Sequence, residues 1–300
     1  MSQQNAPILF TGPDDLRQYI SREKRMGKRI GLVPTMGALH EGHLSLVRAS
    51  CEACDITVVS IFVNPTQFAP NEDFAKYPRT LASDLELLHS CNGTIVVFAP
   101  SVETMYPSCF NTFVEVGGIT ERLEGEYRPT HFRGVATIVL KLFLLVQQDV
   151  AFFGQKDFQQ CAVIKKMVSD LNVPTQITVC PIIREPDGLA MSSRNKYLSQ
   201  EERKQAVVLS ESLLLAQKMF SHGEKDTDTV CRKVREHILT ARDAKIDYAA
   251  IVDPETFEDC TELASGVVIL LAVRIGATRL IDNIILNYSH SLIFCHKKCP

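Results

Sequence analysis

The sequence lacks any long hydrophobic run and any marked excess of one charge. Its longest apolar stretches, 142–146 and 266–273, are far shorter than the roughly 20 residues that a transmembrane helix needs. The first residues contain no basic segment followed by an apolar one, so we expect no secretory signal and a cytoplasmic location. The 32 basic and 35 acidic residues give a formal net charge of −3, which excludes a general attraction to nucleic acids or anionic membranes.

Glycine and proline, with 15 and 14 residues of 300, are too scarce for a collagen-like or low-complexity sequence. Hydrophobic residues make up 45% of the chain and charged residues 22%, which is typical of a folded globular protein. The length suggests two domains, or one large domain with an appendage. The ten cysteines are scattered through apolar stretches, which favours free thiols in a reducing compartment over a disulfide framework.

Two groups of cysteines offer a non-enzymatic alternative, a thiol-rich metal or redox module. Cys51 and Cys54 form a CxxC pair, and Cys295 and Cys299 flank His296 in the terminal tail. Neither group is repeated at the spacing of a zinc finger, and the first falls in a predicted helix. The cysteines therefore do not define a site by themselves.

Short apolar runs alternate with helical patterns over the first part of the chain. The run 56–63 shows no polar alternation, which is typical of a strand covered on both faces. Helices between such strands predict a doubly wound, Rossmann-like α/β domain with a parallel sheet over residues 1–180. The predicted strands are 30–33, 56–63, 94–98, 150–153 and 176–179, and the helices between them are predicted near 40–53, 80–90, 134–147 and 157–171. A further helix is predicted before the first of these strands, with Pro13 near its start and Lys24 and Arg25 in its last turn.

The pattern changes after Asn195, where helical sequence precedes strand-like runs. This order predicts a smaller α+β domain over 181–286, closing over the site of the first domain, followed by a tail over 287–300. The helices are expected at 200–221 and 227–242, and the strands at 246–252, 267–273 and 278–285.

The segment 30–47 carries the most specific signal, a buried strand that leads through a glycine-bearing turn into a helix. The unpaired N–H groups at such a helix start favour an anion, and glycine lets a phosphate approach the backbone. Gly37 and Gly42 have the spacing of a P-loop, but His43 stands where that motif needs Lys. A metallopeptidase HExxH motif is also excluded, because a single residue separates Glu41 from His43.

Cationic and hydroxyl side chains are expected at the same sheet edge. His40 and His43 are three residues apart, so both imidazoles face one side of the helix and can donate hydrogen bonds to one phosphate. Lys156 follows a strand, and Ser192, Ser193 and Arg194 lie in a polar segment between the domains. Each motif alone also fits surface histidines, a solvated lysine or a linker. Together, without a nucleophile motif, they indicate transfer involving a nucleotide phosphate.

The sequence closely resembles the pantothenate synthetase, or pantoate–β-alanine ligase, family of the nucleotidyltransferase-like superfamily, which uses HxGH and KMSKS-like motifs. The resemblance covers nearly the whole chain to about residue 286. The matching segments are 34–43 (PTMGALHEGH), 62–68 (FVNPTQF), 77–80 (YPRT), 128–135 (RPTHFRGV), 153–157 (FGQKD), 187–195 (DGLAMSSRN) and 278–283 (TRLIDN).

The resemblance implies an ATP-dependent condensation of pantoate with β-alanine through a pantoyl adenylate, releasing pyrophosphate and AMP. It implies Mg²⁺ with the ATP substrate, no tightly bound organic cofactor, no nucleic-acid or membrane partner, and a homodimer formed through the nucleotide-binding domain. The ligands of Mg²⁺ stay undetermined, with Asp84 considered only as an outer-sphere contact. An alternative on the same motifs is a nucleotidylyltransferase that acts on a phosphorylated alcohol.

The resemblance also implies roles for individual residues. His43 is the expected proton donor beside His40, and Lys156 and Arg194 are expected to stabilise phosphate charge. Substrate contacts are expected from Gln67, Gln160 and Asn64. The expected ATP-binding residues are Pro34, Thr35, Met36, Gly37, Ala38, Leu39, His40, Glu41, Gly42, His43, Gly154, Gln155, Lys156, Asp157, Ile183, Met191, Ser192, Ser193 and Arg194. One departure is Thr130, where glycine is common in the family, which is expected to stiffen that loop.

Overall fold

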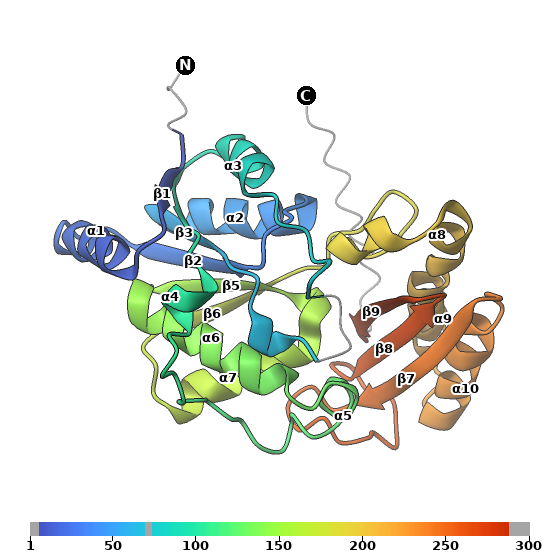
Figure 1. Cartoon of the computed structure of the whole chain (residues 1–300). Helices are drawn as coiled ribbons and strands as arrows, with labels where there is room; N and C mark the ends of the chain where they lie inside the picture. Colours follow the sequence, from blue (N-terminus) through green and yellow to red (C-terminus); the bar gives the residue numbers. More distant parts are fainter. Residues whose placement is uncertain (1–5, 70–73, 288–300) are drawn as a thin grey trace. The chain divides into compact units, whose positions relative to one another are not determined.

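The computed structural model describes residues 6–69 and 74–287, which form two compact units, one up to Leu198 and one from Ser199 (Figure 1). This boundary lies later than residue 180, where the sequence analysis places it. Residues beyond 180 belong to the first unit because they fold back on it. The Met191 N–H donates to the Ile183 carbonyl at 2.9 Å, and the Tyr77 and Ser193 hydroxyls lie 3.4 Å apart.

The first unit contains a six-stranded sheet with the order β1-β4-β3-β2-β5-β6, and all five pairings are parallel. The predicted strands all form, so the predicted fold class is confirmed. Strand β1 was not predicted, because its three residues are too few to show a periodic pattern. The strands are β1 (Ile8–Phe10), β2 (Ile30–Thr35), β3 (Ile56–Ile61), β4 (Thr94–Phe98), β5 (Val150–Gly154) and β6 (Gln176–Cys180).

Helices cover both faces of this sheet (Figure 1). Helices α1 (Pro13–Arg25), α6 (His131–Val146) and α7 (Phe158–Asp170) contribute to the core on one face. Helices α2 (Glu41–Ala53) and α3 (Leu81–His89) contribute to the core on the other. The remaining short helices are α4 (Val102–Met105), α5 (Glu124–Tyr127), η1 (Pro65–Gln67), η2 (Gln155–Asp157) and η3 (Ser193–Tyr197).

The unbroken apolar sequence of β3 follows from this two-sided cover. Ile56 and Val58 point into the core beneath α6, whereas Val59 points into the core beneath α2. Alternate residues of the strand therefore reach opposite apolar layers, and neither face can be polar. Val58 and Val59 are both fully buried.

The second unit places three helices before an antiparallel sheet of order β7-β8-β9. The predicted helix 200–221 is wrong in one respect, because Val207 ends one helix and caps the next. The predicted helix 227–242 also ends earlier, at Ile238. The elements are α8 (Gln200–Ala206), α9 (Val208–Ser221), α10 (Thr227–Ile238), β7 (Ala244–Val252), β8 (Val268–Ile275) and β9 (Thr278–Ile285).

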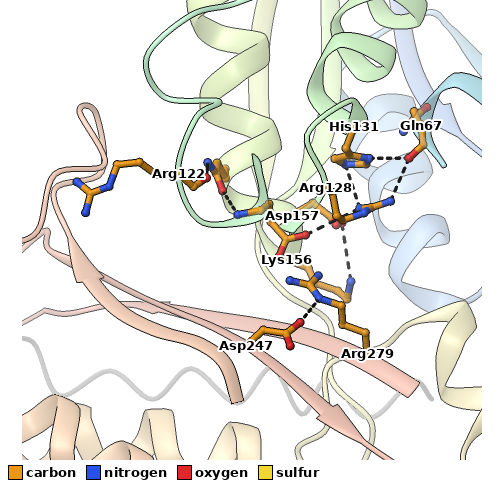
Figure 2. A network of polar contacts seen from close by, with 10 residues as sticks. Gln67, Arg122, Arg128, His131, Lys156, Asp157, Asp247 and Arg279 are labelled. Carbon is orange, nitrogen blue, oxygen red and sulfur yellow. Dashed lines mark hydrogen bonds and ion pairs between the residues drawn. The ribbon is translucent and has the colours of Figure 1, made fainter. Parts of the chain in front are cut away.

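A bulge in β7 accompanies an acidic side chain that contacts arginines of β8 and β9. The register shifts between Ile246 and Tyr248. The Asp247 carboxylate accepts from Arg279 Nε at 2.7 Å (Figure 2) and from Arg274 Nε at 3.3 Å. The side chain of Asp247 is 5% exposed, so these ion pairs compensate a carboxylate largely withdrawn from water.

The N-terminal turn of α6 approaches η1 so closely that one position must be glycine. A Cβ atom on Gly134 would lie 2.4 Å from the Thr66 carbonyl oxygen and 2.9 Å from the Gln67 backbone nitrogen. Both atoms belong to the backbone and cannot rotate away. In contrast, Thr130 has φ −98°, which any L-residue adopts, so glycine is not required there.

We predict that Gly134→Ala lowers the free energy of unfolding by about 1 to 3 kcal/mol, because the added methyl group forces α6 and η1 apart. Urea denaturation followed by circular dichroism measures the change. Gly117→Ala is the matched control, since a Cβ atom there would meet nothing within 4 Å. Equal stability of the two variants would contradict the close approach.

Candidate active site

A pocket of about 210 Å³ opens at the carboxyl ends of β2 and β5 in the first unit. These two strands are neighbours in the sheet, but the chain continues from β2 to β3 on one side and from β5 to β6 on the other. Such a reversal of strand order leaves a crevice where ligands bind in open α/β sheets. The predicted site residues that line the pocket are Pro34, Thr35, Met36, His40, Gly42, His43, Gln67, Gly154, Lys156, Asp157, Gln160, Ile183, Met191, Ser192, Ser193 and Arg194.

The turn from β2 to α2 is held by a buried carboxylate. Asp84, which is 1% exposed, accepts from the Ala38 N–H at 3.0 Å and from the Leu39 N–H at 2.9 Å. The Gly37 N–H donates to Thr35 Oγ1 at 3.1 Å, and Gly37 has φ +78°, which favours glycine. The backbone N–H groups of Gly37, Ala38 and Leu39 therefore donate to side chains of the protein itself.

Some predicted site residues consequently do not line the pocket. Gly37, Ala38 and Leu39 form the turn that Asp84 holds, and the Glu41 carboxylate forms an ion pair with Arg48 on the same helix. Gln155 and Asn64 also lie outside the residues that line the pocket.

Two backbone hydrogen bonds fix the tautomers of the histidine pair. The Gly42 N–H donates to His40 Nδ1 at 3.2 Å, and the His40 N–H donates to His43 Nδ1 at 3.3 Å. Because each Nδ1 accepts, the proton of each neutral ring is on Nε2. The ring centroids are 4.1 Å apart, so the two Nε2–H donors serve one small region.

Burial keeps both imidazoles neutral. It lowers the pKa of His43 to about 3, with further contributions from His40 and Lys156. It lowers the pKa of His40 to about 4, where Lys156 and Lys196 add to the effect and Asp157 opposes it. At neutral pH the pair therefore offers hydrogen-bond donors without positive charge, and the positive charge near it comes from lysine.

The cationic side chains come from two other segments. Lys156 lies in η2, directly after β5, with its Nζ 3.9 Å from the Asp157 carboxylate. Arg194 lies in η3, whose N-cap Ser192 accepts from the Arg194 N–H at 3.3 Å. The Asn195 side chain donates to the Ala190 carbonyl at 3.1 Å and so braces the same loop. The loop and η2 thus bring one lysine and one arginine to the pocket.

The predicted amide residues have different positions. Gln67 and Gln160 line the pocket, whereas Asn64 is 1% exposed and donates to Gln67 Oε1 at 2.9 Å. Asn64 is not among the residues that line the pocket, and its contact with substrate stays a prediction. Asn64 orients the side chain of Gln67.

Arg128 and His131 clamp the backbone beside this amide (Figure 2). Both donate to the Gln67 carbonyl oxygen, Arg128 Nη2 at 3.1 Å and His131 Nδ1 at 3.0 Å. Because a carbonyl only accepts, His131 carries a proton on Nδ1. Both residues line the pocket, and no local pattern in the sequence distinguishes either of them as a site residue.

An apolar wall was also missed from the sequence. It consists of side chains from α6 together with two phenylalanines at the ends of strands, and its members are Phe62, Val135, Ile138, Val139, Leu142 and Phe153. The helical spacing of the α6 residues predicts core packing, which they also provide. Periodicity alone does not distinguish a core residue from one that lines a buried pocket.

The thiols show no sign of a second site within the described ranges. The eight described cysteines are free thiols, and burial raises the pKa of Cys51 and Cys54. No group of three potential metal-binding residues occurs in residues 6–69 and 74–287. Cys295, His296 and Cys299 lie outside the described residues. In the same ranges, no helix has both the length and the hydropathy for a transmembrane span.

Neutral imidazole donors, a lysine and an arginine at the reversal of strand order define the class: a nucleotide-binding α/β enzyme. Residues 8–285 match the model of the pantoate-beta-alanine ligase family. The chain belongs to this family.

Similar proteins cover almost the whole chain. A pantothenate synthetase of Acetivibrio thermocellus is 56% identical over 91% of this chain and 97% of its own length. Pantothenate synthetase 1 of Bradyrhizobium diazoefficiens is 51% identical over 94% of this chain and 99% of its own length. The crystal structure of pantothenate synthetase from Thermus thermophilus has a TM-score of 0.87 and a sequence identity of 43%. The match covers 93% of this chain and 99% of that chain.

A further solved structure was determined with ligands. The pantoate-beta-alanine ligase of Francisella tularensis, complexed with beta-gamma ATP and beta-alanine, is 35% identical. Its TM-score is 0.77, over 95% of this chain and 100% of that chain. Together, the family and these relatives identify an ATP-dependent ligase that forms pantothenate from pantoate and β-alanine. The nucleotidylyltransferase alternative is therefore not supported.

We predict that acidification destabilises the ligand-free protein through the histidine pair. The pKa of each ring is below its ordinary value of 6.5 in the folded state, so the unfolded chain binds more protons as the pH falls below 6.5. Each histidine should cost about 1 to 2 kcal/mol of stability between about pH 7 and pH 5. Urea denaturation at both pH values measures this loss. The loss of stability should be smaller in the His40→Gln/His43→Gln double variant. An equal loss in the variant and the unmodified protein would contradict the lowered pKa values of the two histidines.

Proposed function

We propose that this pocket carries out both half-reactions of pantothenate formation. In the first, an oxygen of the pantoate carboxylate forms a bond to the α-phosphorus of ATP, the α–β phosphoanhydride bond breaks, and pyrophosphate leaves. In the second, the amine of β-alanine bonds to the acyl carbon, AMP leaves, and the nitrogen releases a proton. The observation that carries this proposal is the meeting of phosphate-binding groups, amides and an apolar wall in one pocket.

The phosphate-binding groups act by stabilising charge. Lys156 and Arg194 contribute positive charge, and His40 and His43 contribute Nε2–H donors to the phosphate oxygens. His43 is neutral and donates a hydrogen bond through Nε2–H. The family resemblance alone suggests instead that His43 transfers a proton. Ser192 and Ser193 add hydroxyl donors, and Gly154, Asp157 and Ile183 contact the nucleoside.

The remaining lining residues recognise pantoate. Its carbon with two methyl groups fits against the apolar wall, where Val139 and Leu142 offer no polar atoms. Gln67 and Gln160 hydrogen-bond its hydroxyl and carboxylate oxygens without adding a charge. This arrangement leaves the carboxylate toward the phosphate-binding groups.

Mg²⁺ accompanies ATP in this proposal and is held mainly by phosphate oxygens and water. Asp157 is the acidic residue among those that line the pocket. Asp84 does not line the pocket, and both of its carboxylate oxygens already accept hydrogen bonds from backbone N–H groups. A site with few carboxylates fits Mg²⁺, which retains waters and binds substrate phosphates. Bound in this way, Mg²⁺ would offset the charge of the triphosphate.

Three expectations from the sequence remain predictions. The first is a homodimer formed through the nucleotide-binding domain. The second is closure of the C-terminal domain over this pocket. The third is a cytoplasmic location, with which the free thiols of the described residues are consistent.

ATP–pyrophosphate isotope exchange tests the first half-reaction. We expect exchange with pantoate in the absence of β-alanine, and none without an acid or with a hydroxy acid that lacks the two methyl groups. Exchange that needs β-alanine, or none from folded protein that binds ATP, would reject the adenylate intermediate.

We predict that Lys156→Ala and His43→Ala each lower turnover by about two orders of magnitude, because each removes a preorganised donor to the transferring phosphate. Steady-state kinetics with saturating substrates measure the effect, and circular dichroism checks the fold. Lys165→Ala, on the exposed face of α7, is the matched control. Turnover near that of the control in both variants would refute these roles.

A further inference from the structure

A line of hydrogen bonds leads from Tyr106 to Gln67. The Tyr106 and Thr66 hydroxyl oxygens are 3.3 Å apart, and Thr66 Oγ1 lies 2.9 Å from Asn64 Oδ1. Asn64 Nδ2 lies 2.9 Å from Gln67 Oε1. Tyr106 is outside the set of residues that line the pocket, so it reaches the site only through these intermediates.

The direction of each bond in this line can be deduced. Asn64 Nδ2 also donates to the Gly134 carbonyl at 3.1 Å, which fixes the amide with Oδ1 toward Thr66. Since Oδ1 can only accept, the Thr66 hydroxyl donates to it. The single proton of Thr66 is then in use, so its oxygen accepts from the Tyr106 hydroxyl.

The line ends by setting the orientation of the Gln67 amide. Its Oε1 already accepts from Asn64, and its carbonyl oxygen already accepts from Arg128 and His131. The group that Gln67 can offer to the pocket is therefore the Nε2 amide, a donor. A donor at this position selects an acceptor oxygen, such as a carboxylate or the lone pair of a hydroxyl.

Tyr106 is itself held firmly. Its ring centroid lies 5.0 Å from that of Phe110 and 6.1 Å from that of Phe62, and Lys141 Nζ is 5.6 Å from the ring. Burial raises the pKa of Tyr106, so the phenol is protonated at neutral pH and can donate. Its position at the start of the line is thus set by ring packing and not by substrate.

We propose that Tyr106 is a positioning residue for pantoate, which acts through Thr66 and Asn64 to keep Gln67 Nε2–H directed at the substrate. This inference deepens the proposed function and rests on the pantoate-binding role of Gln67. Successive donors in one direction reinforce each other, so loss of the first weakens the orientation of the last.

Tyr106→Phe removes only the hydroxyl group and tests the proposal. We expect the KM for pantoate to rise about threefold to tenfold, the effect of one lost hydrogen bond, with kcat and the KM for ATP unchanged. Tyr19→Phe is the matched control, because Tyr19 also packs on a phenylalanine, and no hydrogen bond of its hydroxyl occurs within the described part of the chain. An unchanged KM for pantoate in Tyr106→Phe would overturn the proposal.

Variants of Thr66 separate positioning from packing. Thr66→Val keeps the shape and should raise the KM for pantoate to a similar extent, whereas Thr66→Ser keeps the hydroxyl and should restore the normal value. Equal KM values for pantoate in Thr66→Val and Thr66→Ser would refute the proposed line of hydrogen bonds.

Gln67→Ala distinguishes failure of this inference from failure of the proposed function. We expect Gln67→Ala to raise the KM for pantoate, and Tyr106→Phe to add nothing further in that background. A normal KM in Gln67→Ala would refute the pantoate role of Gln67 and the inference together. A raised KM in Gln67→Ala, with independent and additive effects of Tyr106→Phe, would refute the inference alone.

Discussion

The buried carboxylate of Asp84 sets the geometry on which the rest of the site depends. Two backbone N–H groups of the β2–α2 turn donate to it, so the direction in which α2 leaves the sheet is fixed. That direction makes His40 the N-cap of α2 and places His43 one turn further along the same helix. A carboxylate suits this task because its two oxygens can accept from neighbouring amides at once. The histidine pair therefore depends on a residue that does not line the pocket.

The site is preorganised because its polar groups are oriented by the protein before substrate arrives. Backbone N–H groups hold the Nδ1 atoms of both histidines, which leaves Nε2–H as the donor on each ring. Asn64 holds Gln67 in the same manner. Such fixed donors need no reorganisation when charge develops on a transferring phosphate, which is the main source of catalysis in phosphoryl-group chemistry.

Packing and function use the same residues on α6. Gly134 permits the close approach of α6 to η1, and its carbonyl accepts from Asn64. Val139 and Leu142 belong to the hydrophobic core and also line the pocket. This apolar wall of the pocket is thus as rigid as the core, since it is part of the core. Changes in substrate preference at this wall would therefore affect stability as well.

The sequence by itself determined the parallel α/β sheet and the α+β character of the second unit, and it predicted that His40, His43, Lys156 and Arg194 meet in one site. These features can be predicted from local patterns, because a buried strand, a helix start and two histidines three residues apart each involve only a few consecutive residues. Only the tertiary structure decided the hydrogen-bond partners of Asp84, Asn64 and Tyr106. Asp84 acts on Ala38 from 46 residues away, and Tyr106 acts on Thr66 from 40. The α6 wall and the domain boundary after Leu198 were likewise decided by folding, since periodicity does not show which apolar side chains enclose a cavity.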